Sequence, residues 1–234
     1  MRSDSTLQQL KEEGRQRLYP SLTNPNWLVL NKRRRLLESW FSALGAHALQ
    51  VADIGGRIQP YRALLGERVK RYISIDLQET ALVDVVARAE ALPLRDNAFD
   101  LVLCTQVLEY IDEPQELICE AHRILKPGGH LILTAPSIFP RDSDHDSWRF
   151  MPAGLQYLLR NYSTTQIVAE GSSVIGIFRT LAIIFSIYVK PNWLARIARC
   201  TLVPLFNLAG VVCDDIFKSK NDQFAVNFGV LAQK

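Results

Sequence analysis

The sequence predicts an α/β protein built on a mostly parallel sheet, and two observations support this prediction. Short apolar runs alternate with stretches of helical pattern from residue 49 onward. These runs are too short and too uniformly apolar for amphipathic helices, as expected of strands buried on both faces. With 234 residues, 48% hydrophobic and 22% charged, the chain is long enough for one large domain, and its composition excludes collagen-like and wholly disordered proteins.

Two helices are expected before the first strand. Residues 5–18 have a polar helical pattern. A second helix is predicted from Asn26 to about Leu44, with Asn24 as its N-cap and Pro25 at its first position. We therefore expect an N-terminal helical extension over residues 1–48.

Residues 49–234 are expected to form one domain that contains all the strands. The expected strands in chain order are Gln50 to Ile54, Tyr72 to Ile75, Val83 to Ala87, Asp100 to Cys104, His130 to Ala135, Thr165 to Glu170 and Phe224 to Leu231. An apolar helical insertion is expected over residues 174–214, before the last strand.

This apolar insertion raises the question of a membrane. Its first part, Val174 to Val189, contains Arg179 and is shorter than the roughly 20 apolar residues that a spanning helix needs. Its second part, Trp193 to Val212, is expected to be broken by Pro204. We expect no spanning helix, and three roles stay open for residues 174–212: peripheral contact with a membrane, a cover over the sheet edge or lid, and a dimer contact.

Charge and cysteine content narrow the function classes. The net charge is +3, and no basic, aromatic-studded groove is apparent, so nucleic acid is not an expected partner. The four cysteines are widely spaced and lack histidines at zinc-finger spacing, which predicts a reducing compartment and no metal site. Because residues 1–17 have no apolar core of a secretory signal, we expect a cytoplasmic protein, and a peripheral location on the inner membrane face stays open.

A glycine turn follows the first expected strand, in Asp53-Ile54-Gly55-Gly56. Such a turn lets a ligand approach the backbone closely. Asp76 ends the second strand, where a carboxylate can accept both hydroxyls of a ribose. The three-glycine pattern of dinucleotide sites is incomplete here, so an adenosine-containing ligand other than a dinucleotide is favoured.

Further motifs stand in a specific order along residues 49 to 136. They are Asp53-Ile54-Gly55-Gly56, Ile75-Asp76, Ala89-Glu90-Ala91-Leu92-Pro93-Leu94, Asn97-Ala98-Phe99-Asp100-Leu101-Val102, Val107-Leu108-Glu109-Tyr110 and Arg123-Ile124-Leu125-Lys126-Pro127-Gly128-Gly129. In this order they resemble class I S-adenosylmethionine-dependent methyltransferases, most of all the small methyltransferases of polysaccharide and lipopolysaccharide biosynthesis.

The resemblance implies a fold, a cofactor and a set of binding residues. The implied fold is a doubly wound, Rossmann-like sheet of seven mostly parallel strands with an antiparallel last strand, and the implied cofactor is S-adenosylmethionine. The residues that it places around the cofactor are Asp53, Gly55, Gly56, Asp76, Leu77, Ala89, Glu90 and Thr105.

The acceptor side is expected in the loop after the fifth strand, which is dense in ionisable groups. His145 is the candidate base, with Asp146 as its orienting carboxylate. Trp148 and Arg149 are candidates for holding a sugar or an anionic group, and Tyr110 is a candidate acceptor contact.

The sequence therefore predicts a methyltransferase that methylates an oxygen of a sugar or lipid-linked glycan. Two alternatives stay open. The acceptor is a lipophilic small molecule such as a quinone, or the chain is a degenerate, non-catalytic module with the same fold. The oligomeric state is not predicted.

Overall fold

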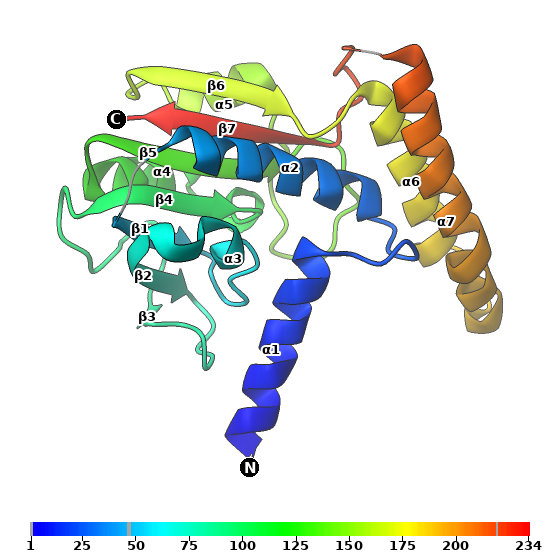
Figure 1. Ribbon diagram of the computed structural model, residues 1–234, viewed down its shortest axis with the longest axis horizontal. Helices are drawn as coiled ribbons and strands as arrows, with labels where there is room; N and C mark the ends of the chain where they lie inside the picture. The colour runs from blue at the N-terminus through cyan, green and yellow to red at the C-terminus, as the bar shows by residue number, and fades with distance from the viewer. Residues whose placement is uncertain (1, 46–47, 219) are drawn as a thin grey trace.

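The structure is a computed structural model that describes residues 2–45, 48–218 and 220–234. Its sheet has seven strands in the order β3-β2-β1-β4-β5-β7-β6 (Figure 1). The strands are β1 Leu49–Ile54, β2 Val69–Asp76, β3 Val85–Val86, β4 Phe99–Thr105, β5 Leu125–Pro136, β6 Thr164–Ala169 and β7 Asn227–Gln233. Strands β1 to β5 pair in parallel, and β7 runs antiparallel to both β5 and β6. The predicted fold class is confirmed.

Helices cover both faces of this sheet. They are α1 Arg2–Leu18, α2 Trp27–Ala43, α3 Arg62–Leu65, α4 Pro114–Ile124, α5 Pro152–Leu158, α6 Ser173–Ile187 and α7 Asn192–Phe217, with short 3₁₀ helices at Gly66–Arg68 (η1) and Leu108–Tyr110 (η2). On one face, α2 and α3 pack on β1, β4 and β5 through a buried cluster that includes Trp40 and Leu101. On the other, α4 and α5 pack through a cluster that includes Leu117 and Val102. The sheet is thus doubly wound, and its apolar strand residues are buried on both sides.

The start of α2 differs from the prediction. Asn26, not Asn24, is the N-cap, and the helix begins at Trp27. The side chain of Asn24 instead accepts the backbone N–H of Asn26 at 2.8 Å, which makes a turn before the helix. Pro25 therefore lies in this turn rather than in the helix.

The prediction that Pro204 breaks the second apolar segment is wrong. Helix α7 is continuous over 26 residues and includes Pro204. A proline inside a helix removes one backbone hydrogen bond. The long contact between α7 and α6 keeps the rest of the helix in place.

Helices α6 and α7 form a hairpin that stands beyond the carboxyl ends of the parallel strands (Figure 1). Helix α7 is long and apolar enough to cross a membrane by length and composition, and 17% of its most apolar window is buried. Among the residues whose burial the structure describes, twelve of the twenty exposed large apolar side chains lie on this hairpin: Ile177, Ile184, Ile187, Tyr188, Trp193, Leu194, Ile197, Leu205, Leu208, Val212, Ile216 and Phe217. The hairpin thus presents an apolar surface to its surroundings.

Candidate functional site

A cavity of about 280 Å³ lies at the carboxyl ends of β1, β2 and β4. Five of the predicted cofactor residues line it, namely Gly55, Asp76, Leu77, Ala89 and Thr105. In an open parallel sheet, this edge on either side of the first strand is where ligands bind. We call this space the cofactor cavity.

Gly55 shapes the turn that closes one side of the cofactor cavity. Its φ is +78°, a conformation that residues with a Cβ rarely adopt. A Cβ at this position would also overlap Cγ2 of Val107. Its N–H donates to the carbonyl of Ile75 at 2.8 Å, which fixes the turn against β2. Only glycine meets both demands.

The remaining walls suit S-adenosylmethionine. One oxygen of the Asp76 carboxylate accepts the N–H of Gln78 at 2.8 Å, and the second oxygen, which accepts no hydrogen bond from the described residues, is available to ribose hydroxyls. Leu77, Ala87 and Ile111 supply apolar surface of the kind on which an adenine ring packs. The residues present therefore fit this group.

Three predicted cofactor residues do not line the cavity. Asp53 is buried behind it, where it accepts the hydroxyl of Tyr72 at 2.6 Å, and burial raises its pKa to about 7. Gly56 lies beside Asp53, and a Cβ there would come within 2.8 Å of the carboxylate. The carboxylate of Glu90 accepts a hydrogen bond from Nη2 of Arg88 at 2.6 Å. Direct contact of these three with the cofactor stays a prediction, and the structure shows them holding the surrounding turns.

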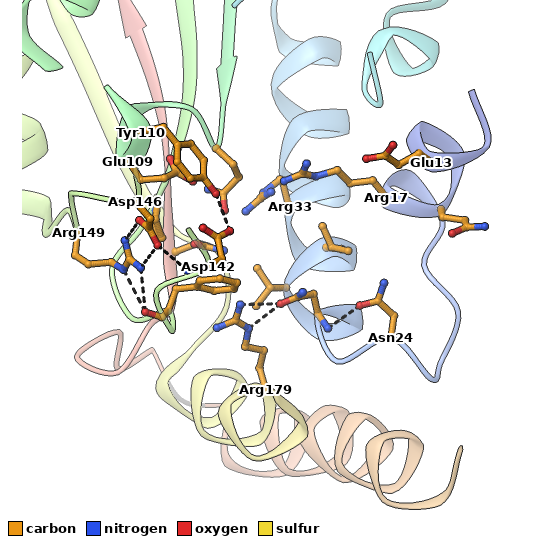
Figure 2. A pocket seen from close by; sticks show the side chains of 18 residues that line it. Glu13, Arg17, Asn24, Arg33, Glu109, Tyr110, Asp142, Asp146, Arg149 and Arg179 are labelled. Carbon is orange, nitrogen blue, oxygen red and sulfur yellow. Dashed lines mark hydrogen bonds and ion pairs between the residues drawn. The ribbon is translucent and has the colours of Figure 1, made fainter. Parts of the chain in front are cut away.

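A second cavity, of about 300 Å³, adjoins the first and shares Arg17, Gln106 and Tyr110 with it. Figure 2 shows side chains from α1, α2, η2, α6 and the segment after β5 pointing into it. The lining includes four arginines and four carboxylates: Arg17, Arg33, Arg149, Arg179, Glu13, Glu109, Asp142 and Asp146. We call this space the acceptor cavity, because a group bound in it would lie next to the cofactor.

Glu109 is the most unusual side chain of the acceptor cavity. It is 4% exposed, and its Oε2 has no hydrogen bond within the described part of the chain. Burial raises the pKa of this carboxyl to about 7. Glu109 belongs to the sequence motif that ends at Tyr110, which by itself predicts no role for this residue. The only sequence signal was its position, a few residues after the fourth strand.

Some of the residues predicted for the acceptor side line the acceptor cavity, and others do not. Asp146 and Arg149 line the acceptor cavity, but they are paired with each other, and this pairing lowers the pKa of Asp146. Tyr110 lines both cavities and donates to Asp142 at 2.7 Å. His145 is exposed and lines neither cavity.

Trp148, the remaining predicted acceptor contact, lines neither cavity. It is 43% exposed, and its indole N–H donates to the carbonyl of Ile111 at 2.8 Å. The structure thus does not bring His145 and Trp148 to the cavity walls, and the roles predicted for them stay predictions. Within the described ranges there is no group of three or more metal-ligating side chains.

Helix α1 contributes to the wall of the cofactor cavity. Arg57, in the turn after β1, lines this cavity and forms an ion pair with Glu13 of α1 at 2.7 Å. Arg17, one turn further along α1, lines both cavities. The N-terminal extension is thus part of the site.

Comparison with known proteins identifies the domain. Residues 52–133 match a family of methyltransferase domains. These residues also carry the strands and the glycine turn of the cofactor cavity. Residues 52–133 therefore match a methyltransferase domain, and the fold around them is similar to that of S-adenosylmethionine-dependent methyltransferases of known structure. The cofactor of such a domain is S-adenosylmethionine.

Several relatives of this methyltransferase domain are known. An uncharacterized protein of Methanocaldococcus jannaschii is 32% identical over 36% of this chain and 40% of its own. The ubiquinone/menaquinone biosynthesis C-methyltransferase UbiE of Ruegeria sp. is 36% identical over 39% of this chain and 32% of its own. The chain thus spans less than half the length of these two proteins. A ubiquinone biosynthesis O-methyltransferase of Paraburkholderia xenovorans is 22% identical over 83% of this chain and 82% of its own.

Solved structures show the same fold around the methyltransferase domain. A methyltransferase from Archaeoglobus fulgidus superposes with a TM-score of 0.52 at 16% identity, covering 86% of this chain and 94% of the other. The [4+2]-cyclase SpnF superposes with a TM-score of 0.51 at 17% identity, covering 86% and 82%. Because these identities are low and one neighbour is a cyclase, the likeness concerns the fold and not the reaction.

Proposed function

We propose that the protein transfers a methyl group from S-adenosylmethionine to a hydroxyl oxygen of a lipophilic small molecule of the quinone class. The observation that supports transfer is the junction of the two cavities, where Gln106 and Tyr110 line both and Glu109 lies beside them. A ligand in each cavity would place a donor and an acceptor side by side, which is the main requirement of a displacement reaction. When bound, S-adenosylmethionine supplies a methyl group on a positively charged sulfur.

Glu109 is the proposed general base. A hydroxyl that attacks a methyl group must lose its proton, and the buried carboxylate has one oxygen without a partner to take it. With its pKa raised to about 7, this carboxyl is a stronger base than an exposed glutamate and is still largely ionised above neutral pH. A positioned base contributes roughly 10² to 10⁴ in rate.

The choice of a lipophilic acceptor over a glycan has two supports. Relatives that align over most of their length are ubiquinone biosynthesis O-methyltransferases, at 22–24% identity. The acceptor cavity also adjoins an apolar cleft of about 220 Å³, and the two share Phe139 and Arg179. A free sugar has no apolar group that would fill such a cleft, whereas a ring with an apolar substituent does.

The α6–α7 hairpin supports a proposal that this function is carried out at a membrane surface. Exposed Lys190, Arg196 and Arg199 lie near the turn of the hairpin, next to exposed Tyr188 and Trp193. Aromatic and basic side chains of this kind suit the boundary between acyl chains and anionic headgroups. We therefore propose peripheral contact on the cytoplasmic face of a membrane.

The function is tested by labelled methyl transfer. The purified protein and methyl-labelled S-adenosylmethionine are incubated with a lipid extract of bacterial membranes and, separately, with soluble glycan precursors. Label in the solvent-extractable lipid fraction, lost in Glu109→Gln and in Asp76→Ala, is the expected result. Label in glycans would overturn the acceptor class. No label in either fraction, together with no calorimetric binding of S-adenosylhomocysteine, would leave a non-catalytic module.

Membrane contact is tested by sedimentation with vesicles. Vesicles of phosphatidylcholine with phosphatidylglycerol should retain the protein more than phosphatidylcholine alone, and Trp193→Ser with Ile197→Ser should release it. Tyr157→Ser, which changes an exposed aromatic residue on α5, is the matched control. Equal retention of all three proteins, or a stable dimer by light scattering that the double substitution dissociates, would overturn the contact.

A further inference from the structure

The arginines of the acceptor cavity differ in what balances their charge. Arg33 is paired with Glu170 at 2.7–2.9 Å, and Arg149 is paired with Asp146. Arg179 is 2% exposed and has no carboxylate partner in the part of the chain that the structure describes. A buried cation without a counter-ion is costly, so its surroundings require an explanation.

Neutral groups hold Arg179 in a fixed position. Its Nε and Nη2 donate to Oδ1 of Asn26 at 3.0 and 2.7 Å, and its Nη1 donates to the carbonyl of Ile138 at 3.2 Å. Its guanidinium lies over the ring of Phe139, 4.4 Å from the centroid. Figure 2 shows this side chain rising from α6 into the acceptor cavity. A guanidinium has five N–H groups, so two remain for a ligand.

Arg179 also stands where the polar cavity changes into the apolar cleft. The cleft is lined by Ile138, Phe139, Pro140, Arg179, Thr180, Ile183 and Ile184. Of these, Arg179 is the one charged side chain, and Ile184 is 42% exposed at the outer side of α6. An oxyanion on Arg179 would therefore have polar surface on one side and apolar surface on the other.

We propose that the acceptor is an anionic amphiphile, with its carboxylate or phosphate on Arg179, its hydroxyl toward Glu109 and its apolar chain in the cleft between residues 138–140 and α6. This inference rests on the proposed function, because it names the acceptor of the same site. Half-buried Arg17, on the opposite side of the cavity, adds a second positive charge with no ion pair among the described residues. Oxyanions bind arginine through paired, charge-assisted hydrogen bonds.

The test uses three probes of known chemistry below their critical micelle concentrations. Octyl phosphate carries the anion and the chain, octyl β-glucoside carries the chain alone, and inorganic phosphate carries the anion alone. Each is titrated calorimetrically into the protein saturated with S-adenosylhomocysteine. Octyl phosphate is expected to bind at least tenfold more tightly than either partial probe.

Two variants divide this binding between the anion and the chain. Arg179→Gln should remove most of the preference for octyl phosphate over octyl β-glucoside, and Arg179→Lys should restore part of it. Ile184→Glu, at a partly exposed position, should weaken octyl phosphate and leave inorganic phosphate unchanged. Arg160→Gln, on an exposed arginine beyond α5, is the control that should change nothing. Thermal melting of each variant shows whether it is folded.

Three results would overturn the proposal. Equal binding of octyl phosphate and octyl β-glucoside would show that the anion does not contribute to binding. Equal binding of octyl phosphate and inorganic phosphate would show that the apolar chain does not contribute. Absence of binding by all three probes would remove the subsite. Because none of these measurements involves methyl transfer, they can fail while binding of S-adenosylhomocysteine and transfer of label persist, and the proposed function is then untouched.

Discussion

Arg33 of α2 and Glu170, directly after β6, form a bidentate ion pair with N–O distances of 2.7 to 2.9 Å, and their side chains are 2% and 0% exposed. This pair joins the N-terminal extension to the far edge of the sheet. Because Arg33 also lines the acceptor cavity, the pair fixes one wall of that cavity. Folding and the acceptor site depend on the same contact.

The first prediction concerns the loss of this pair. Arg33→Met should lower the free energy of unfolding by about 3–5 kcal/mol, because it leaves the Glu170 carboxylate buried and unpaired. The double variant Arg33→Met with Glu170→Leu should recover most of the loss. Urea denaturation followed by circular dichroism measures both, and a double variant no more stable than the single one would contradict the explanation.

The second prediction concerns pH. The pKa of Glu109 rises on folding from an ordinary value of 4.5 to about 7 because of burial. Ionisation is therefore easier in the unfolded chain, so stability is full at low pH and is lost as the pH rises from about 4.5 through 7. Glu109→Gln should gain up to about 3 kcal/mol relative to the wild type at pH 8 and little at pH 5.

The control for this pH effect is Glu116→Gln, which changes an exposed glutamate on α4. Its stability should follow the wild type at every pH. Burial also raises the pKa of Asp53 to about 7. Asp53→Asn should therefore gain stability at high pH as Glu109→Gln does, and the gain should be reduced by the loss of its hydrogen bond with Tyr72. A flat wild-type stability between pH 5 and 8 would contradict the raised pKa values.

The third prediction concerns the glycine turn. Gly55→Ala should abolish binding of S-adenosylhomocysteine and destabilise the protein, because the positive φ and the overlap with Val107 both disfavour a Cβ. Gly154→Ala is the matched control, since a Cβ at that helical position meets open space. It should raise stability by about 0.5–1 kcal/mol and leave cofactor binding unchanged.

The fourth prediction concerns the contact of α1 with the cofactor cavity. Glu13→Gln should weaken S-adenosylhomocysteine binding a few-fold by releasing Arg57, with a stability change below about 1 kcal/mol because the pair is partly exposed. Glu12→Gln, which breaks a pair with Arg15 within the same helix, should leave binding unchanged. Isothermal titration at low and high salt measures the affinity of both variants for S-adenosylhomocysteine. Equal affinities of Glu13→Gln and the wild type would show that α1 does not act on the cavity.

Much of the fold could be predicted from the sequence because its strands are buried on both faces. Uniform apolar runs such as that around Leu101 have few alternatives to a central strand, and the observed β4 begins and ends within one residue of the predicted range. The positions of Gly55 and Asp76 on the wall of the cofactor cavity could also be predicted, since both residues stand at strand ends. The third strand was harder, because only Val85 and Val86 pair with β2.

The acceptor cavity was much less predictable, for a physical reason. Arg33 stands within the basic run Lys32 to Arg35, which in isolation is typical of a solvated helix face. Its burial depends on Glu170, 137 residues away in the chain. The same holds for Arg179, which meets Asn26 across 153 residues. Local sequence patterns do not contain such long-range partners.

The two cavities draw on different parts of the chain. Apart from Arg17, the cofactor cavity is lined by residues within 52–133, the part shared with the methyltransferase family. The acceptor cavity takes only Gln106, Glu109 and Tyr110 from that part. Changes in the N-terminal helices and in the region after β5 would therefore alter the acceptor cavity and leave the segment shared with the family unchanged. Proteins that share the family segment and differ elsewhere are expected to have diverged in this way.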